Sequence, residues 1–116
     1  MSKRDPWVAV RQMLDLAEEA AELVRGKTRA DLDRERVLTL ALTRLVEVVG
    51  EAASRVPEEL RRRRPELPWS QIVAARNRLI HGYDDISLDI LWDILTEDLP
   101  ALIPSLREML GEADAG

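Results

Sequence analysis

The chain has 116 residues, of which 46% are hydrophobic, so it is long enough for one compact domain and too short for two. It contains no cysteine, which excludes disulfides and cysteine-based zinc sites. Its net charge of −5 argues against a general nucleic-acid-binding protein, because such proteins gain affinity from an excess of lysine and arginine. No stretch approaches the ~20 apolar residues of a membrane helix and no signal-like run opens the chain, so we expect a cytoplasmic protein with no membrane partner.

Two long amphipathic helices are predicted in the first half of the chain. Asp5 and Pro6 are typical of an N-cap and a first helical position, and apolar side chains then recur at helical spacing over residues 7–24. After a linker at residues 27–33, a second apolar stripe covers residues 38–56. Its apolar arc is wide, so we expect this second helix to pack on two sides and to form the centre of the fold.

Shorter helical segments are predicted in the second half. Pro57 ends the second long helix, and residues 58–64 are expected to add one or two turns. A further helix, which we call the motif helix, is expected over residues 68–81. Ser87 is typical of the N-cap of a last helical region.

Two prolines are expected to interrupt that last region. Pro100 and Pro104 cannot donate a backbone hydrogen bond, so we expect them to divide it, and we expect residues 111–116 to form a frayed tail. No segment has the pattern of a strand. The sequence therefore predicts one all-α domain over residues 1–116, an antiparallel bundle of four to five helices.

The end of the motif helix carries the residues best suited to chemistry. Arg76, Asn77, the only histidine (His81) and the only tyrosine (Tyr83) lie within this short stretch. In the last turn of a helix, exposed carbonyls and the helix dipole would stabilise a protonated His81. A histidine that exchanges a proton near neutral pH can act as a general acid or base, and an arginine fork suits phosphate. Asn77, four residues before His81, would share its face and orient the imidazole.

The spacing of Arg76 and His81 indicates a dimer. Five positions on an ideal helix place two side chains about 140° apart, so one helix brings them together poorly. A second motif helix across a two-fold axis would supply the missing side chain. We therefore expect a homodimer whose site lies between two motif helices.

The pattern Arg-x4-His-x-Tyr, with Asn after the Arg, resembles the signature of HEPN-domain proteins of the HepT type, the toxins of MNT/HEPN toxin–antitoxin pairs. Further segments resemble the same family across nearly the whole chain: Val49–Ala53, Pro65–Trp69, Leu91–Ile94 and Leu99–Leu102.

This resemblance implies a HEPN-like ribonuclease with Arg76 and His81 as its catalytic pair. It implies RNA as the substrate, which suits a site without a metal, cofactor or side-chain nucleophile, because the RNA 2′-hydroxyl is itself a nucleophile. It also implies that a nucleotidyltransferase antitoxin of the MNT type adds AMP to Tyr83. Glu51, in the family-like Gly-Glu-Ala segment, is expected to support the site by holding Arg76 or a neighbouring arginine.

Three other charged groups allow two interpretations each. Glu47 is expected to pair with neighbours on its own helix rather than to serve the site. The arginine run 61–64 is either a solvated turn or a surface for RNA or a partner. Asp89, Asp93 and Glu97 recur every four residues and either face water or, less simply, bind a metal.

The sequence thus predicts a metal-independent RNA endonuclease, the toxin of a type VII-like MNT/HEPN pair. The alternative is a non-catalytic helical binding subunit that partners a nucleotidyltransferase, in which Arg76 and His81 serve only the structure.

Overall fold

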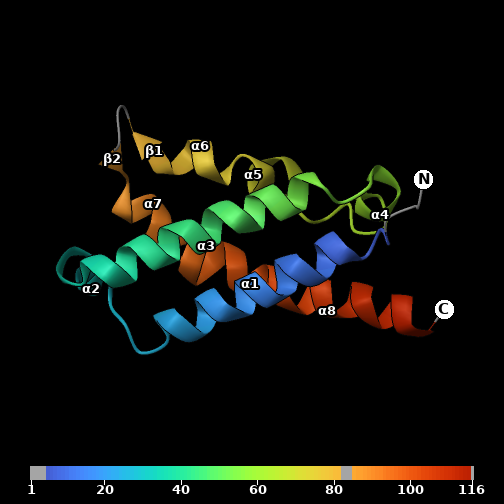
Figure 1. Cartoon of the computed structure of the whole chain (residues 1–116), viewed down its shortest axis with the longest axis horizontal. Coiled ribbons are helices and arrows are strands. Elements are labelled where there is room, and N and C mark those ends of the chain that lie inside the picture. Colours follow the sequence, from blue (N-terminus) through green and yellow to red (C-terminus); the bar gives the residue numbers. More distant parts are fainter. Residues whose placement is uncertain (1–4, 82–84, 116) are drawn as a thin grey trace.

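The helices of the chain form four rods, shown in the computed structural model, which describes residues 5–81 and 85–115. The elements are α1 (Val8–Val24), α2 (Arg29–Arg34), α3 (Arg36–Ser54), α4 (Glu58–Arg61), α5 (Trp69–Val73), α6 (Ala75–Leu79), β1 (Ile80–His81), β2 (Asp85–Ile86), α7 (Leu88–Asp93), the π-helix η1 (Ile94–Asp98) and α8 (Leu99–Ala115). The rods are α1, α3, the pair α5 and α6, and the run from α7 to α8 (Figure 1). The expected all-α bundle is confirmed.

The helix α3 lies in the middle of the bundle. It packs against α1 on one side and against α5 and α6 on the other, as its wide apolar arc predicts (Figure 1). The molecule measures 46 × 30 × 27 Å. The hairpin of β1 and β2 lies at one end of the long axis, and α4 lies at the other (Figure 1).

Local contacts account for the ends of α1 and the start of α2. The Asp5 carboxylate accepts a hydrogen bond from the Trp7 N–H at 2.8 Å in the turn before α1, but the N-cap is Trp7, two residues after the expected position. Gly26 has a φ of 75°, the left-handed conformation that suits glycine after a helix end. The expected linker at residues 27–33 is largely replaced by α2, whose first turn is held by the Asp31 carboxylate, which accepts from the Thr28 N–H at 2.7 Å.

The motif helix differs from the expectation of one helix over residues 68–81. It is divided at Ala74 into α5 and α6, and the chain then becomes extended. Ile80 pairs with Ile86 in a two-residue ladder, and β-branched side chains favour this extended conformation. The Ser87 N–H donates to the Leu79 carbonyl at 2.8 Å, which continues the ladder. The expectation that the chain contains no strand was therefore wrong for this short hairpin.

The last rod is continuous, so the expected division at Pro100 and Pro104 was wrong. Ser87 caps α7 as expected, because its Oγ accepts from the Ile90 N–H at 3.3 Å. In η1 the Leu99 N–H donates to the Ile94 carbonyl five residues back, which makes a wide π turn. Both prolines lie within this continuous rod, Pro100 two residues after the end of η1 and Pro104 inside α8.

The C-terminal residues also differ from the frayed tail expected at 111–116. The helix α8 continues to Ala115, because Leu106 and Met109 are fully buried and fix its last turns against the core. Glu112 forms an ion pair with Arg64 beside α4. Within the part of the chain that the structure describes, no helix combines the length and apolar character that crossing a bilayer requires.

Candidate active site

Gly50 allows α3 to approach α5 closely. A Cβ at this position would lie 2.9 Å from the Ile72 carbonyl oxygen and 3.4 Å from that of Val73, which is too near for any other residue without a backbone shift. This contact fixes the end of α5, and therefore the start of α6, against the middle of α3. The family-like Gly-Glu-Ala segment thus positions the motif through its glycine.

Arg76 is a largely exposed cation that one carboxylate holds. Its side chain, on α6, is 65% exposed, and its Nε lies 3.5 Å from Oε2 of Glu47 on α3, which is only 22% exposed. Glu47 was expected to pair within its own helix, and the structure adds this contact to another element. The sequence offered one sign of this contact. Glu47 lies one helical turn before Gly50, so both residues lie on the face of α3 that meets the motif segment.

Glu51 serves a different arginine. Its Oε1 lies 3.5 Å from Nη1 of Arg44, on the same helix, and the same Nη1 lies 3.9 Å from Oε1 of Glu47. Of the two roles expected for Glu51, the structure therefore shows the contact with a neighbouring arginine and not the contact with Arg76. Two exposed guanidiniums, those of Arg44 and Arg76, flank the Glu47 carboxylate.

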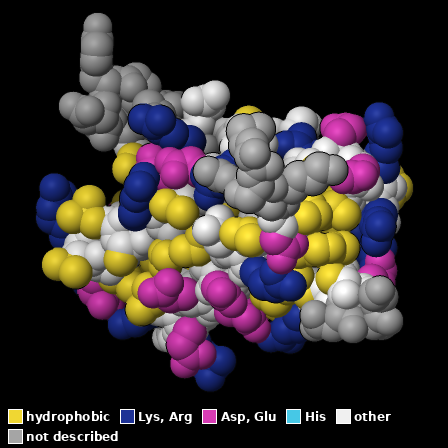
Figure 2. Space-filling view, turned by 45° about the vertical axis from the view of Figure 1, so that its right-hand side comes forward, with side chains coloured by type: hydrophobic (Ala, Val, Ile, Leu, Met, Phe, Trp, Pro, Cys, Tyr) yellow, Lys and Arg dark blue, Asp and Glu magenta, His cyan; other side chains and the backbone are white. Residues whose placement is uncertain are grey.

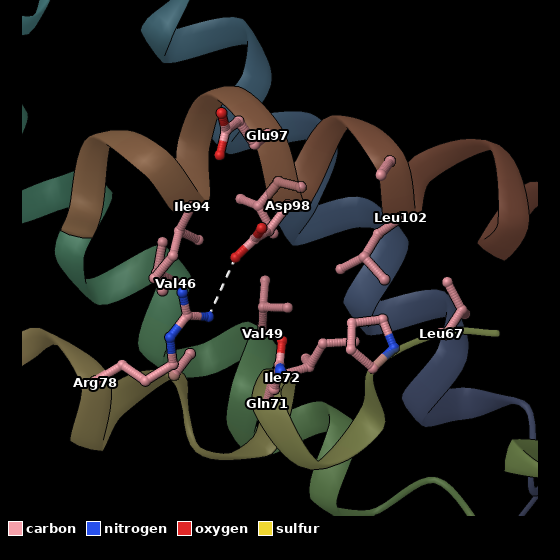
Figure 3. A pocket seen from close by; sticks show the side chains of 14 residues that line it. Val46, Val49, Leu67, Gln71, Ile72, Arg78, Ile94, Glu97, Asp98 and Leu102 are labelled. Atoms are coloured by element: carbon pink, nitrogen blue, oxygen red, sulfur yellow. Dashed lines mark hydrogen bonds and ion pairs between the residues drawn. The ribbon is translucent and has the colours of Figure 1, made fainter. Parts of the chain in front are cut away.

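Arg78 fastens the other side of α6. Its Nη1 donates to Oδ2 of Asp98 in η1 at 3.1 Å, and both side chains line a cavity of about 130 Å³ (Figure 3). Apolar side chains from α3, α5 and α8, such as Val49, Ile72 and Leu102, line most of this cavity (Figure 3). The short helix α6 is thus tied by one arginine to α3 and by another to η1.

His81 does not continue the helix that carries Arg76 and Asn77. Its backbone lies in β1, opposite Asp85, while the Asn77 side chain is exposed on α6. The helical neighbourhood expected for Asn77 and His81 was therefore wrong, and so was the angle of about 140° between Arg76 and His81, because the helix ends at Leu79. The His81 side chain and the whole of Tyr83 lie outside the described part of the chain.

Two further charged residues, Arg61 and Asp89, are engaged in structural contacts. Arg61 donates to the carbonyls of Ala53 and Val56 at 2.9 and 3.1 Å, so it caps the end of α3. Asp89 accepts from Nε of Arg29 at 2.8 Å and so ties α7 to α2. Among the side chains that the structure describes, no three of His, Cys, Asp or Glu gather as they would around a metal ion.

The surface carries both signs of charge. On the face in Figure 2, Lys and Arg side chains alternate with Asp and Glu side chains, and hydrophobic side chains form a band between them. Positive charge on this face is therefore local and does not form a wide basic surface. This distribution agrees with the net charge of −5.

Comparison with known proteins gives the family. Residues 13–109 match the family described as ribonuclease HepT-like. A protein of Caldanaerobacter subterraneus subsp. tengcongensis, named as a candidate RNase, is 31% identical over 92% of this chain and 96% of its own length. A protein of Thermococcus cleftensis, named as a candidate ribonuclease HepT, is 35% identical over 76% of this chain and 83% of its own length. No solved structure matches the chain. The chain belongs to the HepT-like ribonuclease family.

Proposed function

We propose that this protein is a metal-independent ribonuclease toxin that cleaves RNA at a site built around Arg76 and His81. The observation that carries the proposal is the Arg76 guanidinium, which is largely exposed at the start of the family's motif and is held by Glu47. An arginine in this state is free to bind a phosphate, whereas a buried or fully paired arginine is not.

The chemistry assigns one task to each residue. His81 removes the proton from the 2′-hydroxyl or delivers one to the 5′-oxygen that leaves, as a general base or acid. The 2′-oxygen attacks phosphorus while the bond to the 5′-oxygen breaks, which leaves a 2′,3′-cyclic phosphate and a 5′-hydroxyl. Arg76 binds the phosphate and stabilises the charge that builds on its oxygens in the transition state.

The proposal includes a homodimer that brings two α6 segments together. It is supported by the exposed apolar residues Val37 and Leu40 on α3, which are 82% and 50% exposed. Exposed apolar side chains of this kind favour a protein contact, and α3 continues from them towards Glu47. Co-expressed Arg76→Ala and His81→Ala chains are expected to regain activity in mixed dimers if each site takes residues from both chains.

The test of cleavage uses purified protein and a defined RNA in EDTA. Wild type is expected to cut the RNA and yield 2′,3′-cyclic phosphate ends, and Arg76→Ala and His81→Ala are expected to lose at least about 10²-fold in rate. Cleavage that requires a divalent ion would contradict the metal-independent mechanism. A wild-type protein that binds a nucleotidyltransferase but cuts no RNA would favour the non-catalytic binding subunit instead.

The proposed partner is an MNT-type nucleotidyltransferase that adds AMP to Tyr83. The support is the position of this tyrosine in the Arg-x4-His-x-Tyr pattern. The added phosphate would repel the RNA backbone close to Arg76. Co-expression is expected to raise the intact mass by AMP and to restore cell growth, whereas Tyr83→Phe is expected to stay unmodified and toxic. Full silencing of Tyr83→Phe would instead indicate inhibition by binding alone.

A further inference from the structure

We infer that Glu47 is a positioning residue for Arg76, whose guanidinium it holds by the Nε edge so that the Nη amino groups face an RNA phosphate. This inference rests on the proposed ribonuclease function, because it assigns Glu47 a role in the same site. Neither the family pattern Arg-x4-His-x-Tyr nor the Gly-Glu-Ala segment contains this residue.

The closest contact between the two side chains leaves the Nη groups of Arg76 available for a phosphate. Glu47 approaches Nε of Arg76 at 3.5 Å. Arginine has five N–H donors, of which four belong to the Nη groups, and a fork of N–H donors binds a phosphate in two places at once. A carboxylate at the Nε edge therefore orients the fork without blocking it.

The solvent exposure of the two side chains agrees with a positioning residue, Glu47, and a substrate-binding residue, Arg76. Glu47 is 22% exposed and Arg76 is 65% exposed. Glu47 lies on the same face of α3 as Gly50, where a Cβ would be 2.9 Å from the Ile72 carbonyl, so the backbone separation between α3 and α5, which leads into α6, is narrowly fixed. The carboxylate is therefore the anchored partner, and the guanidinium is the partner that solvent and substrate can reach.

The direction of the change in kcat and KM on removing the Glu47 charge distinguishes a positioning role from simple repulsion of RNA. Glu47 is an anion next to a site for a polyanion, so its removal alone should strengthen RNA binding. If Glu47 only repels RNA, Glu47→Gln should lower KM and raise kcat/KM. If it positions Arg76, kcat should fall even though KM stays the same or decreases, because the lost contact acts in the transition state.

The matched control is Asp98→Asn. Asp98 pairs with Arg78, which lies on the same helix α6 but on its other side. Both substitutions thus remove one carboxylate that ties α6 to a neighbouring element. An exposed ion pair adds little to folding stability, so both variants should fold, and only loss of the partner of Arg76 should affect the reaction.

The experiment measures kcat and KM on a defined RNA for wild type, Glu47→Gln, Glu47→Asp and Asp98→Asn. We expect Glu47→Gln to lower kcat by about 10-fold or more without raising KM. Glu47→Asp, which keeps the charge, should recover part of the loss, and Asp98→Asn should change kcat by less than about twofold. An unchanged kcat for Glu47→Gln, or an equal loss for Asp98→Asn, would overturn the inference.

A second readout does not depend on RNA. The NMR signal of the Arg76 Nε–H, assigned by its absence in Arg76→Ala, should shift in Glu47→Gln and stay in place in Asp98→Asn. If Glu47→Gln leaves this signal unchanged, the ion pair does not hold Arg76 and the inference fails. A wild-type protein that cuts no RNA would overturn the proposed function, and the NMR comparison would then decide alone whether Glu47 holds Arg76.

Discussion

Two groups of arginines lie towards opposite ends of the long axis and serve opposite purposes (Figure 1). Beside α4, Arg61 donates to two backbone carbonyls and Arg64 is paired with Glu112. On α6, Arg76 has one carboxylate at 3.5 Å and remains 65% exposed. Two arginines of the denser basic run are therefore structural, while its other two, Arg62 and Arg63, are 76% and 52% exposed. The partner of each guanidinium, and not the number of arginines, indicates where a phosphate can bind.

The largest expected effect on activity comes from replacing one arginine of each group, Arg76 or Arg61, by alanine. Arg76→Ala should lower the rate of RNA cleavage by about 10²-fold or more and leave the melting temperature nearly unchanged. Arg61→Ala should do the reverse, because the Val56 carbonyl loses its donor, while the Ala53 carbonyl keeps the Val56 N–H. We expect a cost of about 1–3 kcal/mol in the free energy of unfolding. Cleavage assays and urea unfolding of both variants check this. Equal losses of activity in both would remove the distinction between the two ends.

A change at Gly50 would test the comparison of the two arginine groups further, because this residue sets the position of α5 and therefore of α6, which carries Arg76. Gly50→Ala should destabilise the fold by about 1–3 kcal/mol through overpacking and should also slow cleavage, since α5 must move away from α3. Gly111→Ala is the control, because a Cβ there meets nothing within 4 Å. In the helix α8 it should stabilise by about 0.4–1 kcal/mol. Urea unfolding measures the stability of both variants. An unchanged stability of Gly50→Ala would show that α5 can shift away from α3 at little cost.

The smallest effect concerns a third arginine, Arg34, whose partner is Asp31. The Thr28 N–H and the Arg34 guanidinium lower the pKa of the Asp31 carboxyl from 3.8 to about 2. Because the folded-state pKa is the lower one, the stabilisation is complete above the unfolded value of 3.8 and is lost as the pH falls towards 2. An NMR titration of Asp31 should give this low midpoint, and Asp31→Asn should lessen the acid dependence of stability. A midpoint near 3.8 would contradict it.

Much of the fold could be predicted from local patterns in the sequence, whereas the contacts of the candidate site could be predicted only in part. The apolar stripe of α3 and the Ser87 cap were predictable, since each depends on neighbours within a turn or two. The hairpin at His81 was not predictable, because a two-residue strand carries no periodic pattern. The contact of Glu47 with Arg76 joins residues far apart in the chain, so helix spacing alone could not distinguish Glu47 from Glu51.

The π turn η1 changes the phase of the last rod. Each i to i+5 hydrogen bond encloses one residue more than an α turn, so the faces before and after it are offset by about 100°. The rod uses this offset to serve two sets of neighbours: α7 packs against α2 and α6, and α8 packs against α1. Removal of a single residue from Ile94–Asp98 would restore one uninterrupted α period. It would turn α7 away from the motif segment while α8 stayed in the core, so the length of this turn couples the site to the bundle.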